Sequence, residues 1–126
     1  MADNENKIFF STTLRRPGRT IAYWNLSEER DCRMLVITQI VLGAGANDDE
    51  YNVVELETAE YGGLPIAALK ADENRIKNLH LEFSESEVTI TLIEGSGPII
   101  IHGYFVLEDV DNIYGTGNPN ITSRCL

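Results

Sequence analysis

The segment that decides the fold lies at residues 87–106 and reads EVTITLIEGSGPIIIHGYFV. In its first part, hydrophobic side chains occupy every second position, and Glu or Thr fills the positions between them. The hydrophobic set is Val88, Ile90 and Leu92. This alternation predicts a β-strand with one buried face and one wet face. The Gly and Pro residues of 95–98 predict a turn, and the apolar run after them predicts a second strand.

Similar runs of β-branched and aromatic residues occur along most of the chain, separated by turn-like Gly, Pro, Asn and Asp residues. The expected strands are 7–14, 20–24, 33–42, 51–58, 64–69, 79–83, 88–93 and 99–106. About eight short strands with turns between them predict an all-β sandwich, barrel or jelly roll. We expect one core domain over residues 1–110. The Gly-, Asn-, Thr- and Ser-rich residues 111–126 are expected to form a flexible C-terminal extension.

Two of the expected strands, 33–42 and 99–106, are hydrophobic on both faces. In the first, strict alternation places Met34, Val36, Ile40 and Leu42 opposite Leu35, Ile37 and Val41. In the second, it places Ile99, Ile101 and Phe105 opposite Ile100, Tyr104 and Val106. A domain this small has too little material to bury both faces, so we expect one face of each strand to contact another subunit. The expected oligomer interface is Leu35, Ile37, Val41, Ile100, Tyr104 and Val106. Coverage by a long loop or terminus is the alternative.

The charge is strongly acidic, with 20 Asp and Glu against 10 Lys and Arg and a formal net charge of -10. No Lys or Arg occurs between Arg33 and Lys70, or between Lys77 and Arg124. Such a field attracts cationic partners and disfavours direct binding to nucleic acid or to a membrane surface. No apolar run approaches the ~20 residues that a membrane span needs. A generic solubilising surface is the alternative explanation of the charge.

A search for catalytic or metal-binding patterns gives none. His80 and His102 are isolated from other ligand-type residues at metal-binding spacing, and Cys32 and Cys125 form no CxxC pair. Ser96 lies between adjacent glycines and does not match the GxSxG nucleophile motif. We therefore expect no cofactor, no metal ion and no enzymatic activity.

Three segments resemble one known family. Residues 95–103, GSGPIIIHG, resemble the GSGP-V-x-I-x-G signature of the nucleoplasmin and nucleophosmin core. Residues 51–56, YNVVEL, resemble its FNVVEV strand, and residues 64–70, LPIAALK, resemble its VPVATLK strand. The segments occur in the same order as in the family, and the resemblance extends over roughly residues 8–110.

The resemblance implies an eight-stranded jelly roll, or β-sandwich, assembled as five copies in a ring, with two rings sometimes face to face. Family members act as histone chaperones without nucleotide or metal. For this chain it implies a homopentamer, and in some conditions a decamer, that shields the core histones H2A–H2B and H3–H4 and assists chromatin assembly or remodelling. It also implies location in the nucleus, although no Lys- or Arg-rich import segment is visible. Salt-sensitive Coulomb contacts would allow the histones to be handed over to DNA.

The resemblance also indicates candidate histone-binding residues on two loops. The loop at 48–50 corresponds to the family's A-K-D-E hairpin, and the loop at 27–31 corresponds to its first acidic tract. The candidates are Glu28, Glu29, Asp31, Asp48, Asp49 and Glu50. Asn47 stands where the family usually has lysine, so pairing of two rings loses a Lys-to-acid contact, and we expect single rings at low salt. The alternative function is a non-catalytic jelly-roll module for oligomerisation, or for binding a sugar or other small ligand, without histone activity.

Overall fold

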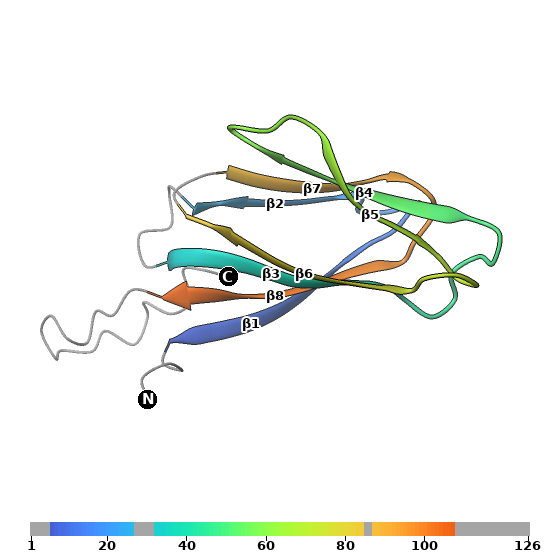
Figure 1. Cartoon of the computed structure of the whole chain (residues 1–126), viewed down its shortest axis with the longest axis horizontal. Helices are drawn as coiled ribbons and strands as arrows, with labels where there is room; N and C mark the ends of the chain where they lie inside the picture. The colour runs from blue at the N-terminus through green and yellow to red at the C-terminus, as the bar shows by residue number, and fades with distance from the viewer. Residues whose placement is uncertain (1–5, 27–31, 85–86, 108–126) are drawn as a thin grey trace, which may run out of the picture.

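A computed structural model describes residues 6–26, 32–84 and 87–107 of the chain. It contains the strands β1 (Lys7–Leu14), β2 (Ile21–Asn25), β3 (Cys32–Leu42), β4 (Tyr51–Thr58), β5 (Leu64–Lys70), β6 (Ile76–Phe83), β7 (Glu87–Glu94) and β8 (Ile99–Leu107). They form two four-stranded antiparallel sheets, β1-β8-β3-β6 and β2-β7-β4-β5, which pack face to face (Figure 1). The prediction of an all-β, eight-stranded sandwich is confirmed, although β6 begins earlier than the sequence pattern indicated.

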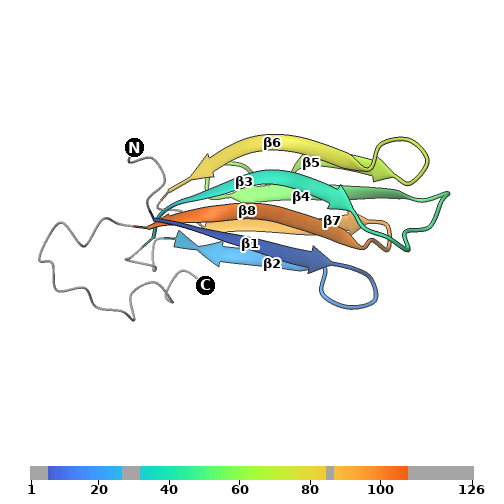
Figure 2. The ribbon, with the colours of Figure 1, turned by 90° about the horizontal axis from the view of Figure 1, so that it is seen from below.

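Connections between strands gather at the two ends of the sandwich (Figure 2). We call one end the hairpin end, defined by residues 15–20, 43–50, 71–75 and 95–98. Hydrogen bonds join its turns, because the backbone N–H of Gly43 donates to the carbonyl of Pro98 at 2.8 Å and that of Arg16 donates to Ser96 at 2.9 Å. The opposite end of the sandwich, which we call the far end, contains the turn at 59–63 and the last residues of β2, β6 and β8.

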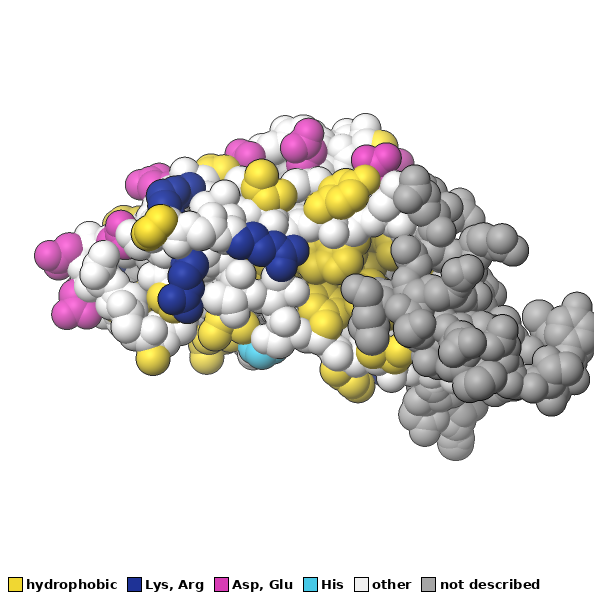
Figure 3. Space-filling view, turned by 180° about the vertical axis from the view of Figure 1, so that it is seen from behind, with side chains coloured by type: hydrophobic (Ala, Val, Ile, Leu, Met, Phe, Trp, Pro, Cys, Tyr) yellow, Lys and Arg dark blue, Asp and Glu magenta, His cyan; other side chains and the backbone are white. Residues whose placement is uncertain are grey.

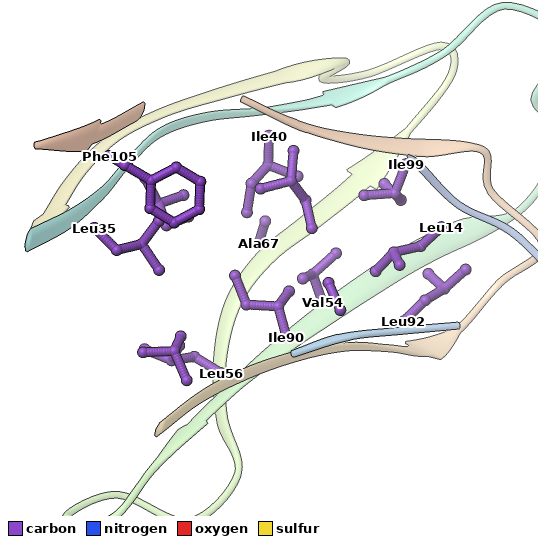
Figure 4. Packing of buried hydrophobic residues seen from close by; sticks show 14 of the residues in the cluster. Leu14, Leu35, Ile40, Val54, Leu56, Ala67, Ile90, Leu92, Ile99 and Phe105 are labelled. Carbon is purple, nitrogen blue, oxygen red and sulfur yellow. The ribbon is translucent and has the colours of Figure 1, made fainter. Parts of the chain in front are cut away.

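Hydrophobic side chains from both sheets fill the space between them (Figure 4). Strand β4 contributes Val54 and Leu56, while β7 contributes Val88, Ile90 and Leu92, all of them buried. In both strands these are the residues that alternation assigned to the core. The polar residues between them face outward, as a sandwich with one-sided strands requires.

Strand β3 departs from strict alternation. Its pairing with β6 and with β8 shifts register between Ile37 and Gln39, which marks a β-bulge at Thr38. A bulge adds one residue and changes which positions face inward. Leu35 and Ile37 are consequently fully buried in the core, and Ile40 faces inward after the bulge. The expectation that Leu35 and Ile37 lie on the outer face and contact another subunit is therefore wrong.

In the three described ranges, no helix is long and apolar enough to cross a membrane. Within the same residues, no group of three or more His, Cys, Asp or Glu side chains is arranged to hold a metal ion.

Candidate functional site

The acidic hairpin between β3 and β4 forms the tip of the hairpin end. Asp48 and Asp49 are exposed there, whereas Glu50 is half-buried. The Glu50 carboxylate accepts hydrogen bonds from the Ser96 hydroxyl at 3.0 Å and from the Asn47 amide at 3.2 Å. Asp48 and Asp49 thus offer free carboxylates to a partner, while Glu50 is largely engaged in holding the hairpin against the turn between β7 and β8.

These contacts change the titration of Glu50. The backbone N–H of Ser96 contributes most, followed among the stabilising contacts by the Ser96 hydroxyl, Asn47 and the positive charge of Arg16. Together they outweigh the opposing effect of partial burial and lower the pKa of Glu50 below its ordinary value. Glu50 therefore stays ionised at physiological pH, with its charge directed toward Ser96.

A buried asparagine holds the turn itself. The Asn52 side chain is completely buried, and its oxygen accepts a hydrogen bond from the backbone N–H of Gly97 at 2.8 Å. Its amide nitrogen donates to the carbonyls of Glu50 at 3.2 Å and Leu69 at 3.4 Å. One side chain thus connects β5, the acidic hairpin and the turn at 95–98, so it fixes the position of the hairpin.

Two glycines of this turn have positive φ, 95° at Gly95 and 76° at Gly97. Residues that carry a side chain rarely adopt positive φ angles. A Cβ atom at Gly95 would also collide with the Asn52 side chain, and one at Gly97 would collide with the carbonyl of Leu14. The two glycines of the GSGP sequence are therefore required by backbone geometry, and Gly95 also by its close contact with Asn52.

A second acidic pair, Asp72 and Glu73, lies in the turn between β5 and β6. Lys70 Nζ is 3.9 Å from Asp72 and 3.7 Å from Glu73, and the Tyr51 hydroxyl donates to Glu73 at 2.9 Å, which raises the pKa of Tyr51. Arg75 anchors this turn to the acidic hairpin through the carbonyl of Gly43 at 2.9 Å. Sequence reasoning missed this pair because only the fold brings it beside the hairpin.

The structure describes only one of the two groups of candidate histone-binding residues, Asp48, Asp49 and Glu50. Residues 27–31, which contain Glu28, Glu29 and Asp31, lie outside the described residues. The acidic hairpin follows the end of β3 at Leu42. Figure 3 shows acidic side chains at the tip of the hairpin end, with Lys and Arg side chains nearby. Of the six candidates, Asp48 and Asp49 are the exposed ones among the described residues.

The outer face of the β1-β8-β3-β6 sheet carries two groups of apolar side chains. Cross-strand pairing places Phe9 beside Tyr104 and Tyr104 beside Val36, with the Phe9 and Tyr104 rings 5.3 Å apart. Phe9 is 72% exposed, which is unusual for a phenylalanine unless another surface covers it. The next row on one side pairs Val106 with Met34. On the other side, a polar row that contains His102 and Gln39 precedes the pair of Val41 with Ile100. We call these eight residues the apolar sheet face: Phe9, Met34, Val36, Val41, Ile100, Tyr104, Val106 and, at its edge, Ile76.

Four of the six expected interface residues lie on the apolar sheet face, namely Val41, Ile100, Tyr104 and Val106, and all four are half-buried. Sequence reasoning missed Phe9 and Met34. Alternation in residues 7–14 could have indicated Phe9, because Phe10 on the opposite face packs against the core.

Comparison with known proteins agrees with this architecture. Residues 7–109 match the nucleoplasmin/nucleophosmin domain. A nucleoplasmin-like protein of Drosophila melanogaster is 44% identical over 105 residues, which are 82% of this chain and 68% of that protein. Nucleoplasmin-like protein NO29 of Xenopus laevis is 39% identical over 68% of this chain and half of its own length.

Among solved structures, the Drosophila NLP core has a TM-score of 0.75 and 42% identity, covering 82% of this chain and all of that one. Its crystal structure was described as providing insight into pentamer formation and histone binding. The nucleoplasmin-like N-terminal domain of Drosophila FKBP39, at 15% identity and a TM-score of 0.53, shares the fold. The family match agrees with the prediction that this chain is not an enzyme. From its strand order, its GSGP turn and these matches, the chain belongs to the nucleoplasmin/nucleophosmin family.

Proposed function

We propose that this chain is the core of a nuclear histone chaperone that assembles into a homopentameric ring and binds H2A–H2B and H3–H4 through acidic loops. The observation that carries the proposal is the 42% identity to the Drosophila NLP core, which this chain covers over its whole length. The net charge of -10 supports a basic partner, because it attracts a protein dense in Lys and Arg.

Ring assembly is supported by the apolar sheet face. An exposed Phe9 next to Tyr104 is costly in water and favourable in a contact between subunits. Val41 and Ile100 form a second apolar pair on the same face, nearer the hairpin end and beyond the polar row of His102 and Gln39. We propose Val41, Ile100, Tyr104 and Val106 as interface residues, together with Phe9 and Met34.

Histone binding at the hairpin end is supported by Asp48 and Asp49. Both are exposed, and within the described part of the chain neither carboxylate makes an ion pair. Glu50 would contribute less, because its carboxylate is held by Ser96. A ring repeats each weak contact in every subunit, so small individual energies combine through effective concentration.

The test is native mass spectrometry of the chain alone and mixed with H2A–H2B, combined with binding isotherms at several salt concentrations. We expect a mass of one ring, a second species that carries histone, and an affinity that falls as salt rises. A protein that sediments as a monomer at micromolar concentration contradicts the ring. A ring that binds no histone indicates the non-catalytic oligomerisation module instead.

A further inference from the structure

A cavity of about 530 Å³ opens at the far end of the sandwich, away from the acidic hairpin. It lies between the two sheets, because one wall is the end of β4 with the turn that follows and the other is the end of β6. Its lining residues are Thr58, Ala59, Glu60 and Tyr61 on one side and Glu82, Phe83 and Ser84 on the other. This volume is in the range of sites that hold a small ligand or a large side chain.

The lining combines negative charge with aromatic rings. Glu60 brings a carboxylate, Tyr61 brings a ring that is 54% exposed, and Phe83 packs against the core. Glu82 is also among the lining residues, but it pairs with Val36, so its side chain lies on the outer face of the sheet. The Glu82 carboxylate is already bonded to the ring of His80 at 2.7 Å. Glu60 has no ion pair within the described residues, and no Lys or Arg is among the lining residues.

The turn that carries Glu60 and Tyr61 is ordered by its own hydrogen bonds. The Thr58 hydroxyl accepts from the backbone N–H groups of both residues at 3.2 Å, and the Thr58 N–H donates to the carbonyl of Tyr61 at 2.9 Å. The carboxylate and the ring are therefore presented from a fixed backbone, which reduces the entropy lost on binding.

A carboxylate next to exposed aromatic rings suits an organic cation. A guanidinium group can donate to the carboxylate and stack on a ring, whereas an ammonium group lacks the planar surface for stacking. A phosphate or a nucleic acid would be repelled by the Glu60 carboxylate. A metal ion finds too few ligands, because the described residues contain no cluster of three ligand-type side chains.

We infer that this cavity binds an arginine side chain of a basic polypeptide, with Glu60 as the anion and Tyr61 as the stacking surface. The inference deepens the proposed function, since a histone would supply the arginine. It adds a defined side-chain site to the diffuse attraction of the acidic loops.

The test uses the intact chain with tetra-arginine and tetra-lysine peptides as probes, measured by calorimetry at low salt and by NMR mapping of backbone amides. The variants are Glu60→Gln and Tyr61→Ala, both on an exposed turn. The matched control is Glu57→Gln, which removes the same charge from the exposed outer face of β4, outside the cavity lining. Binding of H2A–H2B is measured for every variant.

We expect the amide shifts caused by tetra-arginine to centre on 58–61 and 82–84. Glu60→Gln and Tyr61→Ala should each weaken tetra-arginine binding by about two- to fivefold, and Tyr61→Ala should affect tetra-lysine less. The inference would be overturned if Glu60→Gln and Glu57→Gln weakened tetra-arginine binding equally, or if Tyr61→Ala weakened the binding of both peptides equally. It would also be overturned if the parent did not bind tetra-arginine. If the parent binds histone in such a case, only the cavity assignment fails. If the parent binds no histone, the proposed function fails.

Discussion

The side-chain oxygen of Asn52 accepts a hydrogen bond from the backbone N–H of Gly97, 2.8 Å away, in the interior of the hairpin end. The two residues are far apart in sequence and belong to two of the segments that characterise the family, YNVVEL and GSGP. Their contact explains why the segments occur together. YNVVEL supplies the buried amide of Asn52, and GSGP supplies a turn in which only glycine fits so close to that amide.

Asn52→Ala should destabilise the fold by about 1–3 kcal/mol, because it leaves the Gly97 N–H and the Leu69 carbonyl buried without their partner. Urea unfolding at a fixed protein concentration measures the change, since the concentration affects the stability of an oligomer. The control is Asn78→Ala, which removes an exposed amide bonded to Gln39. Equal losses for the two variants would show that the buried contact has no special weight.

Ser96→Ala should raise the pKa of Glu50 toward its ordinary value, because it removes the hydroxyl that donates to the carboxylate. A carboxyl whose pKa is lower in the folded state stabilises the fold above its unfolded pKa, and this contribution is lost as pH falls through the folded pKa. Acid unfolding of the variant should therefore begin at a higher pH. An NMR titration of the Glu50 carboxyl checks the pKa, and Ser11→Ala on the exposed face of β1 is the control. An unchanged pKa would refute the role of the hydroxyl.

Ile100→Asp should dissociate the proposed ring, because it places a charge on the apolar sheet face, where burying an unpaired carboxylate against a neighbour would cost several kcal/mol or more. The side chain is half-buried and points away from the core, so the subunit itself should remain folded. Analytical ultracentrifugation gives the mass and circular dichroism checks the fold. Ala44→Asp, on the exposed hairpin, should keep the parent's mass. A folded variant with the parent's mass would exclude Ile100 from the interface.

Replacing Asp48 and Asp49 together by Asn should leave the ring intact and weaken histone binding, with a shallower dependence on salt. The control is the double change Glu55→Gln and Glu57→Gln, which removes the same charge from the outer face of β4. Isotherms with H2A–H2B and H3–H4 across a salt series compare the two. If the two double variants lose the same histone affinity and show the same salt dependence, only the total charge matters and the hairpin is not a histone surface.

The strand pattern predicted most of the fold because alternation is a local property. It failed in β3, where a bulge at Thr38 reverses which residues face inward. Strict period-two counting cannot detect an inserted residue when both faces are hydrophobic, and Leu35 and Ile37 were misplaced for that reason. In β8, where pairing is regular, the same counting assigned Ile100, Tyr104 and Val106 correctly to the outer side.

The candidate site was less predictable because it depends on contacts between distant segments. The family resemblance indicated Asp48, Asp49 and Glu50 as candidates but gave no means to see that Ser96 engages only the last of them. The cavity at the far end joins the turn after β4 to the end of β6, which belong to different sheets. No spacing in the sequence indicates that Tyr61 and Phe83 line one hollow.

The length of strand β3 also sets the distance between the two ends of the subunit at which partners are proposed to bind. Its 11 residues separate the two ends of the sandwich by roughly 35 Å at the usual rise per residue. A short basic peptide can therefore occupy one end at a time, while a folded partner of similar length can reach both. On the proposed function and the cavity inference, each subunit would carry two docking points, so stoichiometry as well as affinity would distinguish a short peptide from a folded partner.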